Sequence, residues 1–185
     1  MKKSIILPMI GAFCVLSNLS AMEIKPYVGV DLTKTHLGYD SSKDFSNADA
    51  NSYGINIGVK LHENFAVEVS YQNSEEKVVA SNQQWYVDKY TINSLSLDLI
   101  GILPINENFD ILGSIGVASY KTKDIALNYD GGIGTNHMKA ITVGAGIQYN
   151  FADNWSIRGT VKYLGIDESW IDYGMQSSIG LKYTF

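Results

Sequence analysis

The sequence lacks a second cysteine, an excess of positive charge, and any long apolar run after its first 21 residues. One cysteine cannot form a disulfide within the chain, and no later stretch approaches the roughly 20 apolar residues of a transmembrane helix. Acidic residues outnumber basic ones by 19 to 14, which argues against nucleic acid and other polyanions as partners. No Cys–His cluster suggests a metal site, and no motif suggests a cofactor.

The first 21 residues have the composition of a secretory signal peptide. Lys2 and Lys3 precede an apolar run over residues 5–16, and small and polar residues lead to Ala21. Such a segment is removed on export, so we expect a cut after Ala21 that also removes Cys14. The remaining residues 22–185 have the size of one domain.

A short motif recurs and divides the rest of the chain. Glu-Asn-Phe occurs at residues 63–65 and 107–109, and the similar Asp-Asn-Trp occurs at residues 153–155. Each copy ends one alternating segment and starts another, which is typical of a tight turn between two strands. The sequence therefore predicts an array of β-hairpins.

Apolar residues occupy every second position of eight segments, as in strands with one apolar face. The opposite positions are rich in Gly, Ser and Thr and hold all the charges of these segments. An even number of strands lets an antiparallel sheet close as an up-and-down barrel, so we predict an all-β, eight-stranded antiparallel barrel. The segments are residues 28–32, 53–61, 65–71, 95–99, 109–117, 141–151, 155–163 and 179–185.

The predicted connections alternate in length. Short periplasmic turns and longer outer loops are typical of outer-membrane barrels, so the pattern favours a transmembrane β-barrel. The short turns lie near residues 62–64, 104–108 and 152–154, and the longer polar loops near residues 35–51, 73–92, 121–138 and 166–174.

Aromatic residues at the strand ends beside the short turns also favour a membrane location. Rings at one level form a girdle where the hydrocarbon meets the lipid headgroups. The alternative is a soluble secreted ligand-binding barrel, which turns its apolar face inward around a ligand. The predicted girdle residues are Phe65, Phe109, Phe151 and Trp155, with the terminal Phe185 at the same level.

Two stretches carry a resemblance to a known family. They are "ITVGAGIQYNFADNWSIRGTVKY" and the terminal "SSIGLKYTF". The chain resembles small eight-stranded outer-membrane barrels, in particular the transmembrane domain of outer membrane protein A. The resemblance implies an integral protein of the Gram-negative outer membrane, in contact with the lipid bilayer and lipopolysaccharide. It also implies that the barrel-assembly machinery reads the alternating terminal residues Leu181, Tyr183 and Phe185.

One charged pair stands out on the polar face. Glu68 lies three residues after Phe65, and Arg158 lies three residues after Trp155. At about 3.3 Å per residue, both lie about 10 Å from the turns. Their strands are opposite each other in a ring of eight, and an eight-stranded barrel is only wide enough to be filled by side chains. We therefore expect Glu68 and Arg158 to meet in the lumen, because a buried charge without a partner costs several kcal/mol.

The resemblance gives this pair a possible role. In outer membrane protein A a matching Glu and Arg form a lumen salt bridge, and a second Lys and Glu exchange partners with them to gate a small pore. The corresponding positions here hold Asp98 and Gln148, which do not match, although Lys162 or Lys60 could substitute. Two interpretations stay open: a lumen plugged by a polar and charged network, and a narrow gated pore for small solutes or ions.

The outer loops are the predicted place of specific function. Exposed aromatic residues often mark contact surfaces, so a structural or surface-interaction role with an extracellular ligand or host surface is expected; some of these residues could instead extend the strands. The histidines at positions 36, 62 and 137 lack the His-x-Ser motif of lipid A-modifying barrels, and no enzymatic activity is predicted. The loop aromatic residues are Trp85, Tyr86, Tyr90, Trp170 and Tyr173.

Overall fold

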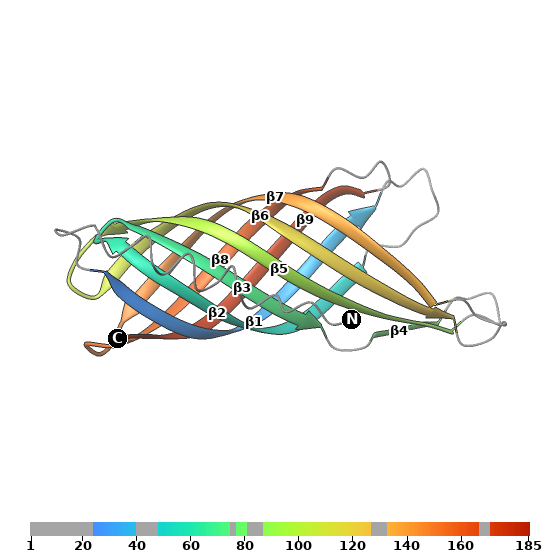
Figure 1. Cartoon of the computed structure of the whole chain (residues 1–185), viewed down its shortest axis with the longest axis horizontal. Coiled ribbons are helices and arrows are strands. Elements are labelled where there is room, and N and C mark those ends of the chain that lie inside the picture. The colour runs from blue at the N-terminus through green and yellow to red at the C-terminus, as the bar shows by residue number, and fades with distance from the viewer. Residues whose placement is uncertain (1–23, 40–47, 75–76, 81–86, 127–132, 167–170) are drawn as a thin grey trace, which may run out of the picture.

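A computed structural model gives the fold of the chain (Figure 1). It describes residues 24–39, 48–74, 77–80, 87–126, 133–166 and 171–185. Within these ranges no helix is long and apolar enough to cross a membrane. The strands are β1 (Lys25–Tyr39), β2 (Ala48–His62), β3 (Phe65–Ser74), β4 (Lys77–Ala80), β5 (Val87–Pro104), β6 (Phe109–Ala126), β7 (Ile133–Asn150), β8 (Trp155–Ile166) and β9 (Ile171–Thr184).

The strands form one closed antiparallel sheet. Their order is β3-β2-β1-β9-β8-β7-β6-β5-β4, and β3 also pairs with β5. β3 and β4 both pair with β5, along successive stretches of the same edge. They therefore occupy one strand position, and the barrel has eight strand positions. The predicted eight-stranded antiparallel barrel is confirmed.

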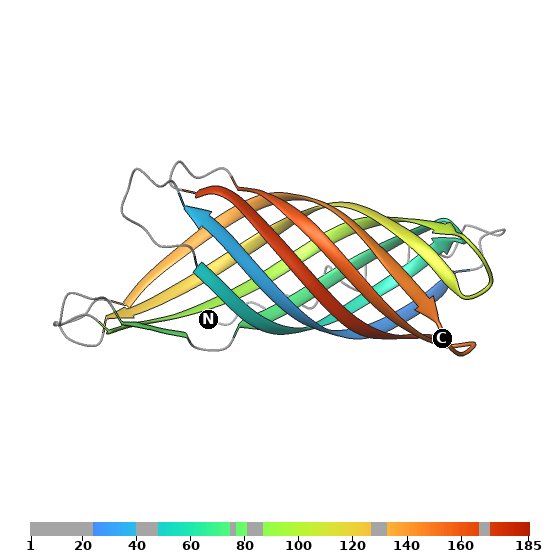
Figure 2. The same cartoon turned by 180° about the vertical axis from the view of Figure 1, so that it is seen from behind.

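Two pairings close the ring. The first strand meets the last through partners such as Tyr27 and Thr184. On the other side, Phe65 of β3 lies opposite Gly101 of β5. Figure 2 shows the tilted strands from behind, with the C-terminus at the end of the barrel that carries the short turns. Closure matters because it removes the free strand edges that would otherwise be costly inside a bilayer.

The strands are longer than the alternation predicts. β5, β6 and β7 each span 18 residues, and much of the sequence expected as loop near residues 73–92 and 121–138 is paired strand. The prediction was wrong here because polar residues on both faces hide the alternation beyond the apolar band. An extension of this kind carries the wall past the roughly 25 Å apolar band of an outer-membrane barrel. The short turns lie where they were predicted.

The apolar face points outward. Val30 and Leu32 of β1 are 55% and 66% exposed, and their neighbours Asp31 and Thr33 are buried. The same alternation of exposed apolar and buried polar residues runs through the other long strands. The alternative of a soluble barrel with an apolar interior is therefore wrong, because the large apolar residues of the alternating face surround the barrel instead of lining it.

The alternation predicts a polar interior throughout, but the interior also contains apolar side chains. Two groups of inward apolar side chains lie within it. We call the group toward the loop end the outer apolar layer; it consists of Leu37, Ala50, Ile92, Ala118, Tyr120, Met138, Ala140 and Leu164. The inner apolar cluster, toward the turn end, consists of Tyr27, Ala66, Ile100, Ile102 and Leu112.

Candidate functional site: the charged lumen

The centre of the lumen is a two-pronged ion pair between opposite walls. Arg158 of β8 donates from Nη1 to Glu68 Oε2 at 2.6 Å and from Nη2 to Glu68 Oε1 at 2.8 Å. The side chains are 7% and 2% exposed. Such parallel hydrogen bonds fix orientation as well as distance, so this pair ties β3 to β8 across the barrel.

Further polar groups complete the coordination of this pair. The Tyr27 hydroxyl donates to Glu68 Oε2 at 2.9 Å, and the Ser70 hydroxyl donates to Glu68 Oε1 at 3.2 Å. Arg158 also donates to Asp31 Oδ2 at 3.3 Å, and Asn56 donates to the same oxygen. Every carboxylate here accepts more than one hydrogen bond, which is what makes buried charge tolerable.

Glycines in the neighbouring strands make room for these side chains. A Cβ on Gly58 of β2 would lie 2.2 Å from Cζ of Tyr27. A Cβ on Gly180 of β9 would overlap the carboxylate of Asp31. Gly in a strand often marks a close approach of this sort, and here the two residues create the space that the network fills.

A second ion pair lies beside the first. Lys162 of β8 donates to Asp98 Oδ2 on β5 at 2.7 Å. Asp98 is fully buried, and it also accepts from Thr142 Oγ1 at 3.2 Å and from Ser96 Oγ at 2.9 Å. Lys162, one of the two lysines named from the sequence as possible substitutes, thus pairs with Asp98.

A third group lies nearer the turn end. Lys182 of β9, which the sequence analysis did not include in the network, donates to Gln148 Oε1 at 2.6 Å. Its ammonium also lies 4.5 Å from the centre of the Tyr27 ring, a cation–π contact. Gln148 donates in turn to Asp110 at 3.0 Å. Lys60 lines an open cavity of about 580 Å³ at the turn end, together with Lys182, Gln148 and Asp110 of this third group.

Little free space remains between these groups. The cavity lined by Glu68, Arg158 and Lys162 measures about 30 Å³, which holds about one or two water molecules. The outer apolar layer lies on the loop side of this cavity, and Ile100 and Leu112 of the inner apolar cluster line the cavity itself.

The outside of the barrel carries aromatic residues at both borders of its apolar band. At the turn end, the predicted girdle residues Phe65, Phe109, Phe151 and Trp155 are all exposed. Trp155 also packs against Tyr183, with ring centroids 4.9 Å apart, and Tyr183 packs against Phe185 at 5.1 Å. At the loop end, an outer set that the sequence analysis missed consists of Tyr53, Tyr71 and Tyr163. Its sequence signal is that each tyrosine lies near the outer end of an alternating segment.

The histidines and loop aromatic residues are scattered. His36 Nδ1 lies 2.6 Å from Asp49 Oδ1 near the loop end, whereas His62 lies at the end of β2 beside a short turn and His137 is exposed on β7. Tyr173 is exposed on β9, and Tyr90 falls within β5. Trp85, Tyr86 and Trp170 lie outside the described residues. No group of three or more potential metal ligands occurs in the described part of the chain.

An antiparallel barrel with an apolar exterior, aromatic borders and a packed polar interior defines an integral outer-membrane β-barrel protein. The sequence agrees, because residues 5–185 match the family described as "Outer membrane protein beta-barrel domain". The chain belongs to this family and resides in the outer membrane of a Gram-negative bacterium. A comparison with curated protein sequences gave no match.

Solved structures show the same fold at low sequence identity. The chain is similar to Ail, the attachment invasion locus protein of Yersinia pestis, with 16% identity, a TM-score of 0.63, and coverage of 89% of this chain and 100% of that one. Neisserial surface protein A is 12% identical, with a TM-score of 0.65 and coverage of 88% and 97%. The N-terminal barrel domain of Pseudomonas aeruginosa OprF is 21% identical, with a TM-score of 0.61 and coverage of 86% and 97%.

Proposed function

We propose that this protein is a closed barrel with a structural or surface-interaction role, carried by its outer loops, and without enzymatic activity. The observation that carries the proposal is how completely side chains fill the lumen. The outer apolar layer lies on the loop side of the Glu68–Arg158 pair, and the side chains around this pair leave a cavity of only about 30 Å³. Desolvating an ion in such a lumen is costly, so the lumen acts as a plug.

The comparisons support a role at the cell surface. Ail is named an attachment invasion locus protein, and Neisserial surface protein A is named for its location. Ail has also been solved with the heparin analogue sucrose octasulfate. The acidic balance of this chain is a poor match for such a polyanion, so we propose a surface partner of another kind, engaged by the loops.

The second candidate is a narrow gated pore. It is favoured by one observation: Glu68, Arg158 and Lys162 line the same small central cavity. A carboxylate beside two cations has more than one possible partner, and an exchange between them would alter the central constriction.

Conductance across a planar bilayer separates the two candidates. The purified, refolded protein is inserted into the bilayer, with a known porin as the positive control for insertion. Absence of discrete current steps is expected for the plugged barrel. Reproducible steps that scale with the amount of inserted protein would overturn the plug and leave the gated pore.

We also propose that residues 1–21 are removed on export and that residues 22–185 form the mature barrel. The intact mass of protein purified from outer membranes tests this boundary. A mass that retains Cys14 would contradict it.

A further inference from the structure

A cavity of about 580 Å³ opens at the turn end of the lumen. Its volume lies within the range of about 300–1,000 Å³ that is usual for sites that bind small molecules. Strands of the barrel form its wall, and each of the three short turns contributes residues to its lining. Because these turns face the periplasm in outer-membrane barrels, the cavity is accessible from the periplasm.

A buried cation and a buried anion line this cavity and are joined by one amide group. Lys182 Nζ donates to Gln148 Oε1 at 2.6 Å, and Gln148 Nε2 donates to Asp110 Oδ2 at 3.0 Å. Lys182 and Asp110 are 8% and 7% exposed, and neither forms a salt bridge with another residue that the structure describes. The amide thus holds two opposite charges apart within one cavity.

The side of the cavity around β1 is positively charged. Lys60 of β2 and Lys25 of β1 pair opposite each other, and both line the cavity together with Lys182 of β9, the other neighbour of β1. Besides Gln148, the ammonium of Lys182 contacts the Tyr27 ring, whose centre is 4.5 Å away. An amide and a ring do not cancel a positive charge, and a buried charge without a counter-ion is costly. This side of the cavity therefore favours a negatively charged group.

The opposite side of the cavity is acidic. β6 lies four strand positions from β1 in the ring of eight, and Asp110 of β6 lines the cavity. Asp110 Oδ2 accepts hydrogen bonds from the uncharged amides of Gln148 and Asn150, each at 3.0 Å. The acidic side therefore favours a positively charged group. The other acidic lining residues belong to the turns: Glu107 before β6, Asp153 after β7 and Glu63 after β2.

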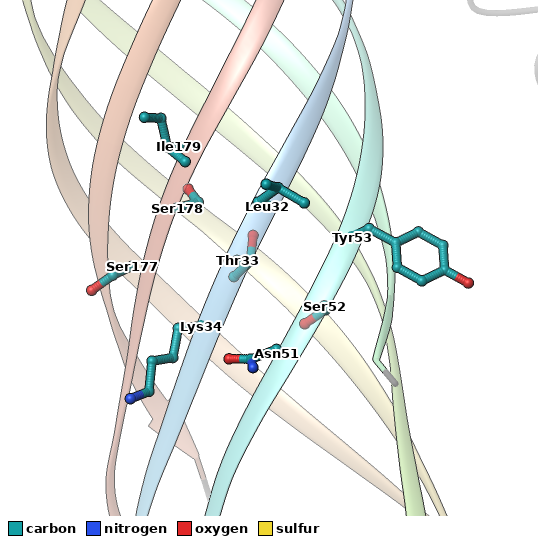
Figure 3. A pocket seen from close by; sticks show the side chains of 9 residues that line it. All are labelled: Leu32, Thr33, Lys34, Asn51, Ser52, Tyr53, Ser177, Ser178 and Ile179. Atoms are coloured by element: carbon teal, nitrogen blue, oxygen red, sulfur yellow. The ribbon is translucent and has the colours of Figure 1, made fainter. Parts of the chain in front are cut away.

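A hollow of about 520 Å³ on the outer wall, over β2, β1 and β9, has a different lining (Figure 3). Lys34 is the single charged residue among the described residues that line it. Its side chain is exposed, and Asp49 Oδ2 lies 3.4 Å from its Nζ. An exposed lysine keeps its ammonium in water, so this hollow lacks the buried, opposite charges that distinguish the turn-end cavity.

We propose that the turn-end cavity binds a small zwitterion of the amino-acid type, with its carboxylate beside Lys182 and Lys60 and its ammonium beside Asp110. The ligand gives each buried charge the counter-ion that the described side chains do not supply. A simple anion meets the acidic residues of the cavity and a simple cation meets its lysines, so neither matches both sides. Ile102 and Pro104 also line the cavity and offer an apolar side chain of the ligand a surface to contact. The inference is independent of the partner of the outer loops and of ion conduction through the lumen.

An NMR titration of the refolded protein in a non-ionic detergent tests this inference. The probes are L-leucine, 4-methylpentanoate, which lacks the ammonium of leucine, and 3-methylbutylamine, which lacks its carboxylate. Leucine should shift the backbone amide signals around Lys182 and Asp110. It should also bind about tenfold more tightly than either half-ligand, because each half-ligand lacks one charge-assisted hydrogen bond. The inference is overturned if leucine binds no more tightly than either half-ligand, or if it shifts no signal in this cavity.

Two variants separate recognition of charge from a loss of structure. Lys182→Met should weaken the binding of leucine and of 4-methylpentanoate by about tenfold, without weakening the binding of 3-methylbutylamine. Asp110→Asn should weaken the binding of leucine and of 3-methylbutylamine, without weakening the binding of 4-methylpentanoate. A loss of structure alone would weaken all three probes alike, and that result would contradict the proposed orientation of the ligand.

A matched control uses the same substitution at the other end of the barrel. Lys34→Met should bind all three probes as wild type does. Lys60→Met tests the positive side of the cavity again, at a position that is only partly buried, and should weaken the binding of leucine. A heat-dependent shift in gel mobility verifies that every variant has folded. Equal leucine affinities of Lys182→Met, Lys60→Met and Lys34→Met would overturn the proposal.

Discussion

Arg158 on β8 holds both carboxylate oxygens of Glu68 on β3, at 2.6 and 2.8 Å, across the full width of the barrel. No backbone pairing joins these two strands. The ion pair is therefore a strut that connects opposite sides of the wall.

Substitution of Glu68 by Ala removes this strut. Arg158 would keep only its longer contact with Asp31, so a buried guanidinium would lose most of its compensation. Breaking a buried ion pair on one side typically costs 3–5 kcal/mol, and we expect unfolding in urea, measured from lipid vesicles, to show a loss of about that size. The double variant Glu68→Met, Arg158→Met should recover part of the loss. A Glu68→Ala barrel as stable as wild type would show that the pair contributes nothing.

Gly58 is required for the position of Tyr27. Replacing Gly58 with Ala places a methyl group against the Tyr27 ring, which displaces the hydroxyl that donates to Glu68. We expect a loss of about 1–3 kcal/mol, the usual cost of overpacking. Gly113→Ala is the matched control, since nothing lies within 4 Å of a Cβ at Gly113. Equal urea midpoints for the two variants would contradict this account.

The outer apolar layer should act as the barrier to ions. Leu164 and Tyr120 belong to this layer and are almost fully buried. Leu164→Ala should destabilise the barrel by about 2–5 kcal/mol, and adding Tyr120→Ala should produce current steps in a planar bilayer that wild type lacks. Leu95→Ala, on the outward face, should produce no current steps. If the double variant folds properly but produces no current steps, the barrier to ions lies at the ion pairs instead.

The terminal Phe185 is proposed to act as an assembly signal together with Leu181 and Tyr183. Its ring is 64% exposed, so removing the ring should cost the folded barrel little. Phe185→Ser should therefore lower the amount of barrel in the outer membrane of cells, yet refold normally in detergent. Phe151→Ser removes another exposed ring at the same end and should assemble as wild type does. Equal defects in cells and in detergent would indicate a structural role for Phe185.

Asp49, near the loop end, should titrate at unusually low pH. The hydrogen bond with His36, and then the proximity of Lys34, lower the pKa of Asp49 below its ordinary value of 3.8. Because the folded state favours the ionised form, its contribution to stability is present above the unfolded pKa and is lost as the pH falls through the lower folded pKa. Carboxyl chemical shifts from NMR, followed below about pH 4, measure the pKa directly. His36→Ala should raise it, and an unchanged pKa would show that the contact is not formed in solution.

Much of the fold follows from the sequence because the side-chain period of a strand is 2 and each face meets a different solvent. The recurring turns then fix the height of each residue, which is why counting from Phe65 and Trp155 brings Glu68 and Arg158 to the same level. The same counting does not reveal Lys182, because its contact with Gln148 depends on how far each long side chain bends within the lumen.

A simple alternation pattern also does not predict the apolar groups inside the lumen. Ile100 and Leu112 point inward, while the adjacent Leu99 and Ile111 point outward. Consecutive apolar residues are the sequence signal of a strand that is apolar on both faces. The pattern identifies such positions, but it does not show that side chains from several strands meet at one height.

The ring is completed by pairing the first strand with the last, with Tyr27 opposite Thr184. The earliest strand to leave the ribosome must therefore wait, without one of its two neighbours, until the final residues have been synthesised and exported. During that interval an unpaired edge and a row of apolar side chains are exposed to water, which are the features that promote aggregation. The time between export and closure is thus when this chain is most exposed to aggregation, and a truncation that removes β9 extends that interval indefinitely.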